Sequence, residues 1–154
     1  MLKSIHVYDC DGVLVDTSHR YKTKADGTID LDYWRANCTK EKMKLDKILP
    51  HTRQYIADCI NDEVYTILCT SREYSKQNIE FIAGYLGMPD KLIMRPEGNV
   101  EPDAKLKRRQ LQRMFNLIQL QKLPRTLWED NQITIDRLSD MFTHTVYVKS
   151  NQGV

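Results

Sequence analysis

The sequence predicts an α/β protein built on a doubly wound, parallel, five-stranded sheet. Short apolar runs rich in β-branched residues alternate along the chain with longer segments of helical periodicity. This alternation indicates right-handed crossover connections and a sheet covered by helices on both faces. The length of 154 residues is that of one ordinary domain, so we expect residues 1–154 to form a single domain.

Five apolar runs are the expected strands. Ser4 to Tyr8 (SIHVY) and Val64 to Cys69 (VYTILC) are β-branched and bounded by polar residues, as buried parallel strands are. The other three are Lys91 to Met94, Thr126 to Trp128 and Thr145 to Val148. Ligands of such sheets bind beyond the carboxyl ends of the strands. The residues that directly follow each run are therefore the candidates for function.

Helical periodicity covers four segments between these runs. They are Leu49 to Ile60, Tyr74 to Leu86, Asp103 to Gln121 and Ile133 to Phe142. Gly87 and Pro89 end the second of them. The stretch from Arg20 to Leu31 (RYKTKADGTIDL) departs from this rhythm, because Asp26 and Gly27 are typical of a hairpin turn between two alternating arms. It predicts a β-hairpin flap directly after the first strand.

The composition indicates a globular, cytoplasmic protein. The chain is 41% hydrophobic and 29% charged, and it holds no apolar run of the length that spans a membrane. Its four cysteines are scattered, which predicts free thiols in a reducing compartment. A net charge of +2 is too small to indicate a nucleic-acid-binding protein, and the basic segment from Lys105 to Arg113 is expected to be a solvated helix face.

Two carboxylates stand at the end of the first strand. Asp9 and Asp11 are separated by one residue, and Gly12 follows, so both side chains can turn toward one pocket where the backbone leaves extended geometry. One carboxylate can attack phosphorus while the other protonates the leaving oxygen and later activates water. A calcium loop is excluded because Arg20 stands at its twelfth position, where such loops carry glutamate. Taken alone, the motif is also compatible with a solvated turn.

Four segments in order resemble the motifs of the haloacid dehalogenase superfamily of phosphatases. The first is VYDCDGVLVDT and the second is TILCTSRE, while DAKLKRRQL and LWEDN match the third and fourth. The resemblance covers nearly the whole chain, from Ser4 to Lys149. Its details are most similar to the phosphatase domain of phage polynucleotide kinase and phosphatase enzymes, which implies a Rossmann-like sheet.

The resemblance implies a role for each matching catalytic residue. Asp9 is the expected nucleophile, Asp11 the general acid and base, and Thr70 a hydrogen-bond donor to a phosphoryl oxygen. Lys107 is expected to neutralise the charge of the nucleophile and the transferring phosphate. Two alternatives stay open: Thr70 could cap the following helix, and Lys105 competes with Lys107, either of which could be surface charge.

The fourth motif places Glu129 and Asp130 at a strand end near Asp9. Adjacent carboxylates repel one another unless a cation lies among them. Mg²⁺ suits such a place, because it prefers a few carboxylates together with water and phosphate oxygens. The resemblance implies Mg²⁺ bound by Asp130, the Asp9 side chain and the Asp11 backbone carbonyl. Glu129 stands where related enzymes more often carry aspartate, and it is expected beside the metal site.

Little chain is left for a large cap over the site. From Asp11 to Thr70 is 59 positions, most of which the hairpin, the first helix and the second strand consume. An uncapped site admits large substrates, including a nucleic-acid end. The candidate substrate-binding residues are Ser71, Arg72, Arg95, Lys22 and Lys24. Tyr21, Tyr33 and Trp34 could stack on bases, although core packing is the favoured interpretation for Trp34.

Three functions are compatible with these residues. The first is a Mg²⁺-dependent phosphatase of nucleotide or nucleic-acid terminal phosphates, with the 3' end preferred. The second is a phosphatase of free mononucleotides or other small phosphometabolites. The third, an inactive phosphate- or partner-binding module, is disfavoured because such a module has no need of an acid and base at Asp11. No Gly-x-x-x-x-Gly-Lys-Ser/Thr motif occurs, so no kinase domain is expected in this chain, and the oligomeric state stays open.

Overall fold

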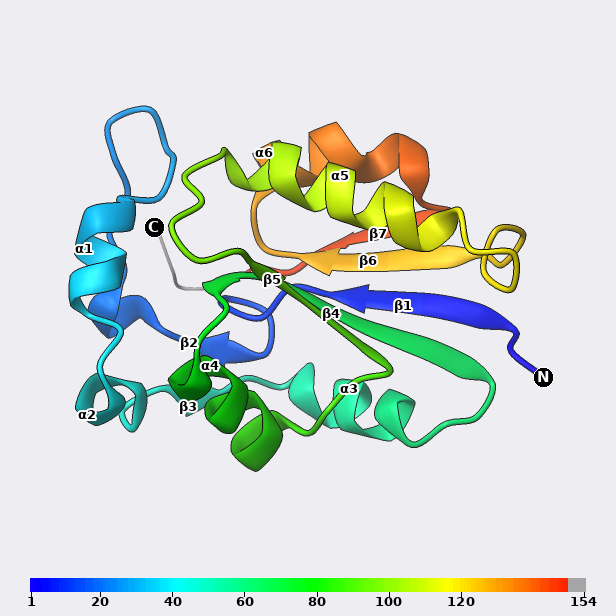
Figure 1. The fold of residues 1–154 in the computed structure, drawn as a ribbon, viewed down its shortest axis with the longest axis horizontal. Helices are drawn as coiled ribbons and strands as arrows, with labels where there is room; N and C mark the ends of the chain where they lie inside the picture. The colour runs from blue at the N-terminus through cyan, green and yellow to red at the C-terminus, as the bar shows by residue number, and fades with distance from the viewer. Residues whose placement is uncertain (150–154) are drawn as a thin grey trace.

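A five-stranded parallel sheet organises the chain, as predicted. The computed structural model describes residues 1–149 (Figure 1). Its strand order is β5-β4-β1-β6-β7. The strands are β1 (Ser4–Tyr8), β4 (Val64–Glu73), β5 (Lys91–Arg95), β6 (Arg125–Glu129) and β7 (His144–Tyr147). Because β1 lies in the middle, between β4 and β6, the residues that follow it are flanked by two other strand ends.

Helices cover both faces of the sheet (Figure 1). One face carries α3 (Thr52–Cys59) and α4 (Lys76–Phe81), which continues into the π-helical turn η2 (Ile82–Leu86). The other carries α5 (Asp103–Phe115) and α6 (Gln132–Leu138), followed by the 3-10 turn η3 (Ser139–Met141). Alternate side chains of the strands point to opposite faces, so the sheet has two buried cores. Ile67 belongs to one and Leu68 to the other.

Several element boundaries differ from the predicted ones, and three of the differences have a visible cause or consequence. Helix α3 begins at Thr52 instead of Leu49, because the residue before Pro50 is biased away from helical geometry. Strand β4 runs on to Glu73, because its polar end pairs again with β5 beyond an irregularity after Cys69. Helix α5 ends at Phe115, and the predicted last turns, 116–121, form non-helical turns instead.

The predicted flap is a short hairpin. Residues 20–31 turn at Gly27, whose φ is 83°, and the arms are joined by an isolated bridge between Thr23 and Ile29 and by the backbone hydrogen bonds from Lys24 N to Thr28 O and from Asp30 N to Lys22 O, at 2.7 and 2.9 Å. Most of the stretch is exposed, and the pairing does not extend into longer strands. An antiparallel pair of strands lies outside this stretch, between β2 (Val15–Asp16) and β3 (Lys47–Ile48).

Residues 17–46, here called the insert, lie between these two short strands. They form the 3-10 turn η1 (Ser18–Arg20), α1 (Leu31–Ala36) and α2 (Lys40–Met43). The two helices were not predicted, because segments of six and four residues are too short to show a helical period. Asp30 and Thr39 begin them by accepting hydrogen bonds from backbone amides. The insert lies beyond the carboxyl ends of the strands (Figure 1).

Two further predictions concern the described residues as a whole. All four cysteines are free, as the sequence predicted. Among residues 1–149, no helix has both the length and the apolar character that crossing a membrane requires.

Candidate active site

Asp9 marks the centre of the carboxyl edge of the sheet. Its backbone amide still donates to the Trp128 carbonyl of β6 at 3.0 Å, so the strand geometry fixes its position. Cys10, the next residue, points into the apolar core, whereas Asp9 and Asp11 both line a pocket. This alternation explains why two carboxylates separated by one residue reach the same cavity. Asp9 is 7% exposed.

Lys107 extends to this edge of the sheet from α5, which covers one face of the sheet. Its Nζ lies 3.0 Å from Asp9 Oδ1, 3.0 Å from Glu129 Oε2 and 3.3 Å from Asp103 Oδ2. Burial opposes the charged form of the amine, but these three carboxylates outweigh it and hold the pKa of Lys107 well above its usual range. Lys105 is exposed and faces away. The geometry therefore supports Lys107, and not Lys105, as the lysine that acts on Asp9.

Three carboxylates gather within reach of one ion. Asp9, Glu129 and Asp130 each present an oxygen within 4.8 Å of the others. Burial, followed by the charge of Glu129, raises the pKa of Asp9 well above its usual range. Burial and its neighbours likewise raise the pKa values of Glu129 and Asp130 to about 7. Such mutual repulsion is the condition that a bound divalent cation relieves, so the residues present fit Mg²⁺.

Both carboxylate oxygens of Glu129 accept hydrogen bonds. Its Oε2 accepts from Lys107, and its Oε1 accepts from the backbone amides of Asp130 and Asn131 at 3.1 and 3.2 Å. It thus shapes the turn that presents Asp130, while its second oxygen stays beside Asp9. Glu129 thus belongs to the group of carboxylates that could hold a metal ion, and its role there stays a prediction.

Gly12 lets Asp130 approach the first strand. Its φ of 86° is a left-handed conformation that favours glycine. A Cβ added there would overlap the Asp130 carboxylate. Glycine is therefore required at position 12 for two reasons: the backbone conformation there, and the space that the Asp130 carboxylate occupies.

Arg72 holds Asp11. Its Nη2 donates to Asp11 Oδ1 at 2.8 Å, and its Nε lies 3.2 and 3.1 Å from the two oxygens. The guanidinium is fully buried and stacks over the Phe81 ring at 4.6 Å. Arg72 does not line the pocket, so the structure does not place it where the prediction of a direct phosphate contact requires. Its place is behind Asp11.

Thr70 and Ser71 occupy the end of β4. Thr70 is 1% exposed, does not line the pocket, and accepts a hydrogen bond from the Arg72 amide at 3.1 Å. It is not a helix cap, because Ser75 caps α4. Ser71 does line the pocket and donates to Asp103.

A cavity of about 440 Å³ opens in front of these groups, between the insert and the first turns of α5 and α6. Its floor is acidic, and the insert contributes Tyr21, Lys24 and Trp34 to its walls. Arg95 also lines it, although its guanidinium is occupied by the carbonyls of Ser71 and Glu101 at 3.3 and 2.7 Å.

Lys22 and Tyr33 lie outside the cavity, whereas Trp34 forms part of its wall. Lys22 is exposed and stacks over the Tyr33 ring at 4.2 Å. Trp34 is 5% exposed, as core packing predicted, and the buried Arg20 lies over its ring at 4.4 Å. Arg20 is thus not available to a nucleic-acid chain.

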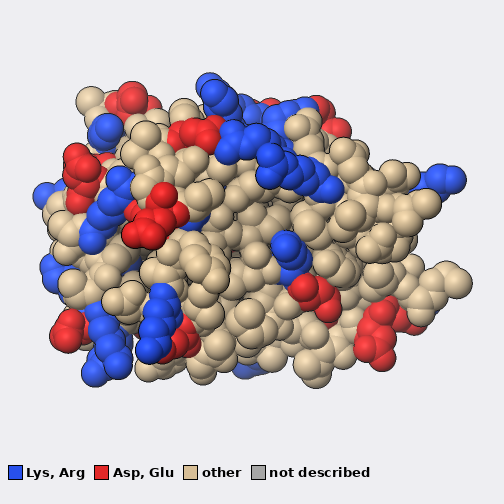
Figure 2. Space-filling model, in the orientation of Figure 1, with Lys and Arg blue, Asp and Glu red and all other residues tan. Residues whose placement is uncertain are grey.

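The basic segment of α5 is largely paired. Figure 2 shows Lys and Arg side chains over this region with acidic side chains beside them. Arg108 donates to Asp140 through two nitrogens, each at 2.7 Å, and Arg109 pairs with Glu101 at 2.6 Å. This pairing supports the prediction of a solvated helix face.

The family follows from a match over most of the sequence. Residues 1–141 match the profile described as bacteriophage T5 5'-deoxynucleotidase. The chain belongs to the bacteriophage T5 5'-deoxynucleotidase family. No curated protein sequence matches it.

Solved structures place this family member within the haloacid dehalogenase fold. A chain of the Pnkp1/Rnl/Hen1 RNA repair complex superposes with a TM-score of 0.61 at 17% identity, covering 96% of this chain and 42% of that one. The chain thus spans less than half the length of that relative. A superfamily hydrolase from Geobacter sulfurreducens gives a TM-score of 0.56 at 10% identity, covering 92% and 85%. The domain of Legionella pneumophila effector Lem4 gives 0.57 at 12%, covering 99% and 88%.

The solved structures confirm the predicted sheet and the haloacid dehalogenase fold, and the description of the matching family agrees with the predicted phosphatase class. Two residues at or near the cavity were not predicted from the sequence. Asp103 belongs to the segment that resembles the third motif, but its contacts with Ser71 and Lys107 were not predicted. Asp46 lies in a charged stretch without any motif, and nothing in its neighbourhood predicts that its side chain is fully buried.

Proposed function

We propose that this chain is a Mg²⁺-dependent phosphomonoesterase that acts through an aspartyl-phosphate at Asp9, with deoxynucleoside 5'-monophosphates as its substrates. The observation that carries the chemistry is the buried Lys107 ammonium 3.0 Å from Asp9 Oδ1, with Asp11 in the same pocket. The family match supports the nucleotide, and a cavity of about 440 Å³ has room for one.

The proposed reaction has two steps. In the first, an Asp9 oxygen attacks phosphorus, the bond to the leaving oxygen breaks, and Asp11 gives that oxygen its proton. In the second, Asp11 takes a proton from water, whose oxygen attacks the aspartyl-phosphate, and inorganic phosphate leaves while Asp9 is restored. Lys107 keeps its charge throughout and orients Asp9 while stabilising the negative charge beside it.

Asp9 and Asp130 are the side chains that would hold the metal. The Asp11 backbone carbonyl is a third ligand by resemblance to the superfamily. Bound there, Mg²⁺ would neutralise the acidic floor and polarise the phosphoryl group. Ser71, beside Asp103, and Lys24, on the insert, are placed to contact the phosphate or the group beyond it.

A second candidate substrate is the 3'-phosphate at a nucleic-acid end. The observation that favours it is the basic rim contributed by the insert, where Lys24 lines the cavity and Lys22 is exposed nearby. Such a rim could follow the phosphates of a chain that continues beyond the terminal group.

A rate comparison tests these proposals. The purified protein with Mg²⁺ is given a deoxynucleoside 5'-monophosphate, a 3'-phosphorylated oligonucleotide and an aryl phosphate, and phosphate release is measured. We expect the mononucleotide to have the highest kcat/KM. The reverse order would favour nucleic-acid ends.

A trapping experiment tests the intermediate. Asp9→Asn should abolish turnover, because it removes the anionic nucleophile while nearly preserving shape. Rapid acid quenching of the wild-type enzyme with a labelled substrate should leave label on Asp9. Near wild-type turnover by Asp9→Asn, or full activity after exhaustive chelation, would refute the corresponding part of the proposal.

A further inference from the structure

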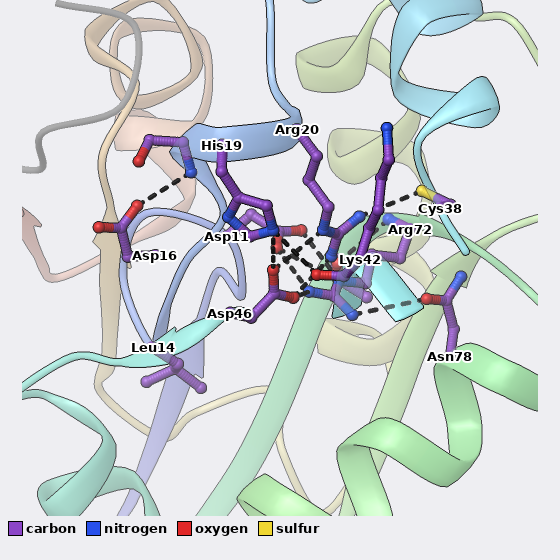
Figure 3. A network of polar contacts seen from close by, with 12 residues as sticks. Asp11, Leu14, Asp16, His19, Arg20, Cys38, Lys42, Asp46, Arg72 and Asn78 are labelled. Atoms are coloured by element: carbon purple, nitrogen blue, oxygen red, sulfur yellow. Dashed lines mark hydrogen bonds and ion pairs between the residues drawn. The ribbon is translucent and has the colours of Figure 1, made fainter. Parts of the chain in front are cut away.

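Two buried arginines share one buried carboxylate behind the pocket (Figure 3). Arg20 donates to both oxygens of Asp46, from Nε at 3.0 Å and from Nη2 at 2.8 Å. Arg72 donates to the same carboxylate from Nη2 at 3.3 Å. His19 Nε2 lies 3.3 Å from Asp46 Oδ1. The side chains of Arg20, Arg72 and Asp46 are all fully buried.

The Arg72 guanidinium thus joins Asp46 to Asp11. The nitrogen that donates to Asp46 is the one that makes the 2.8 Å bond to Asp11. The other terminal nitrogen contacts Asn78 Oδ1 at 3.5 Å, which is too long to anchor it firmly. Apart from Asp11, Asp46 is therefore the nearest hydrogen-bond acceptor of the guanidinium, whose face packs on the Phe81 ring.

Charge balance makes this contact specific. Arg20 and Arg72 carry two positive charges, and the buried Asp46 carboxylate is the negative charge that both of them contact. Buried charges are tolerated when they are paired, and removing one partner leaves the other uncompensated. Without Asp46, both arginines would turn toward the remaining carboxylate, Asp11.

The network also connects the catalytic strand ends with the insert. Asp46 ends the insert just before β3, and Arg20 ends η1. Arg20 packs on Trp34, which lines the cavity, and donates to Cys38 Sγ at 3.2 Å. The position of the insert is thereby tied to the carboxylate that faces the leaving oxygen.

We infer that Asp46 is a positioning residue for Asp11, which it holds through Arg72 in the direction that proton transfer to the leaving oxygen requires. The inference rests on the proposed function, in which Asp11 is the general acid. Proton transfer depends on the orientation of the acid as well as its presence, and small displacements cost large factors in rate.

The leaving group distinguishes this role from a merely structural one. A deoxynucleoside leaves as an alkoxide that must be protonated, whereas a dinitrophenolate leaves without help. The ratio kcat/KM reports the steps up to the first irreversible one, which is formation of the aspartyl-phosphate. Asp46→Asn should lower kcat/KM about 30-fold for a deoxynucleoside 5'-monophosphate and no more than about threefold for dinitrophenyl phosphate.

Asp58→Asn is the matched control. Asp58 is also a buried aspartate, but it accepts hydrogen bonds from Tyr8 and contacts His6 away from the cavity. Its loss should change both substrates by the same factor. Thermal unfolding of each variant reports whether it is folded.

If Asp46→Asn does not fold, the double variant Arg20→Gln with Asp46→Asn takes its place, because it removes one charge of each sign and leaves the net charge of the network unchanged. Parallel loss on both substrates, or no loss, in the folded variant would overturn the inference. A wild-type protein inactive toward both substrates would instead overturn the proposed function.

Discussion

The Lys107 ammonium lies within 3.3 Å of carboxylates from Asp9, Asp103 and Glu129, and these contacts explain why a lysine is buried behind the acidic floor of the cavity. Burial of an isolated amine favours its neutral form, but three negative neighbours reverse that preference. At the same scale, Gly12 provides the space for Asp130. Each buried charge at this site has a specific partner, so single substitutions should give selective effects.

Lys107→Met should reduce turnover by about 100-fold or more, because it removes a fixed charge beside the nucleophile while keeping most of the side-chain volume. Lys105→Met removes the same charge from an exposed position of the same helix and should change turnover less than about twofold. Steady-state kinetics with saturating Mg²⁺ compares the two. The opposite ranking would transfer the role to Lys105.

Gly12→Ala should destabilise the protein by about 1 kcal/mol or more and weaken Mg²⁺ binding, because its Cβ would displace the Asp130 carboxylate and its φ is 86°. Gly84→Ala is the matched control. Gly84 lies in a helical turn with open space around the added carbon, so the change should be neutral or stabilising. Chemical denaturation and metal titration measure both effects. Equal stability of the two variants would contradict this account of Gly12.

At the scale of elements, the insert between β2 and β3 decides what the site can admit. It consists of short helices and an exposed turn. It contributes Tyr21 and Trp34 to the cavity wall, and its exposed turn lines the same cavity with Lys24 and Asp26. The insert is therefore the element whose charges should matter for a large substrate and not for a small one.

Lys22→Gln with Lys24→Gln should weaken binding of a 3'-phosphorylated oligonucleotide and reduce the slope of log affinity against log salt by about 1 to 2, because lost phosphate contacts release fewer counterions. Anisotropy titrations on an Asp9→Asn background measure this slope. Hydrolysis of a small aryl phosphate should change little.

The control for this prediction is Lys40→Gln with Lys44→Gln, which removes the same charge from exposed positions around α2, away from the cavity. It should leave the slope nearly unchanged. Equal effects of the two double variants would show that only net charge matters, and the second candidate substrate would lose its structural support.

At the scale of the whole molecule, the parallel sheet brings acidic strand ends together, and their repulsion opposes folding in the absence of metal. Burial, then the charge of Asp9, raises the pKa of Asp130 to about 7, and burial raises that of Glu129 to about 7. Between about pH 4 and pH 7 the folded protein then holds protons that the unfolded chain has released. The free energy of unfolding of the metal-free protein should therefore fall as the pH rises through this range.

Mg²⁺ should raise the Tm more at about pH 8 than at about pH 6, because at the lower pH it must displace protons from the same carboxylates. Differential scanning calorimetry with and without millimolar Mg²⁺ measures the shift, and Na⁺ at equal ionic strength is the control. Asp130→Asn should reduce the shift at the higher pH. An equal shift at both pH values would contradict a metal site built on these groups.

The sequence by itself determined the sheet and the edge of the sheet at which the acidic residues lie. Buried parallel strands appear as continuous β-branched runs, so Ser4 to Tyr8 and Val64 to Cys69 were recognisable without contacts. Asp9 and Asp11 follow directly from the end of the first run, and local spacing was enough to place them in one pocket. The expected role of Lys107 came from the resemblance of its segment to the third motif of the phosphatase superfamily.

Only the tertiary structure decided that Arg72 contacts Asp11 and that the buried Asp46 side chain lies beside it. Whether an arginine contacts phosphate or supports a carboxylate depends on what faces it, and the partners of Arg72 lie 61 and 26 positions away in sequence. The two short helices of the insert and its β2–β3 base likewise leave no periodic pattern, because their stability comes from packing and pairing with distant residues. Sequence patterns depend on residues that are neighbours along the chain. The contacts of a buried ion network join residues that are far apart in sequence and meet only in the folded chain.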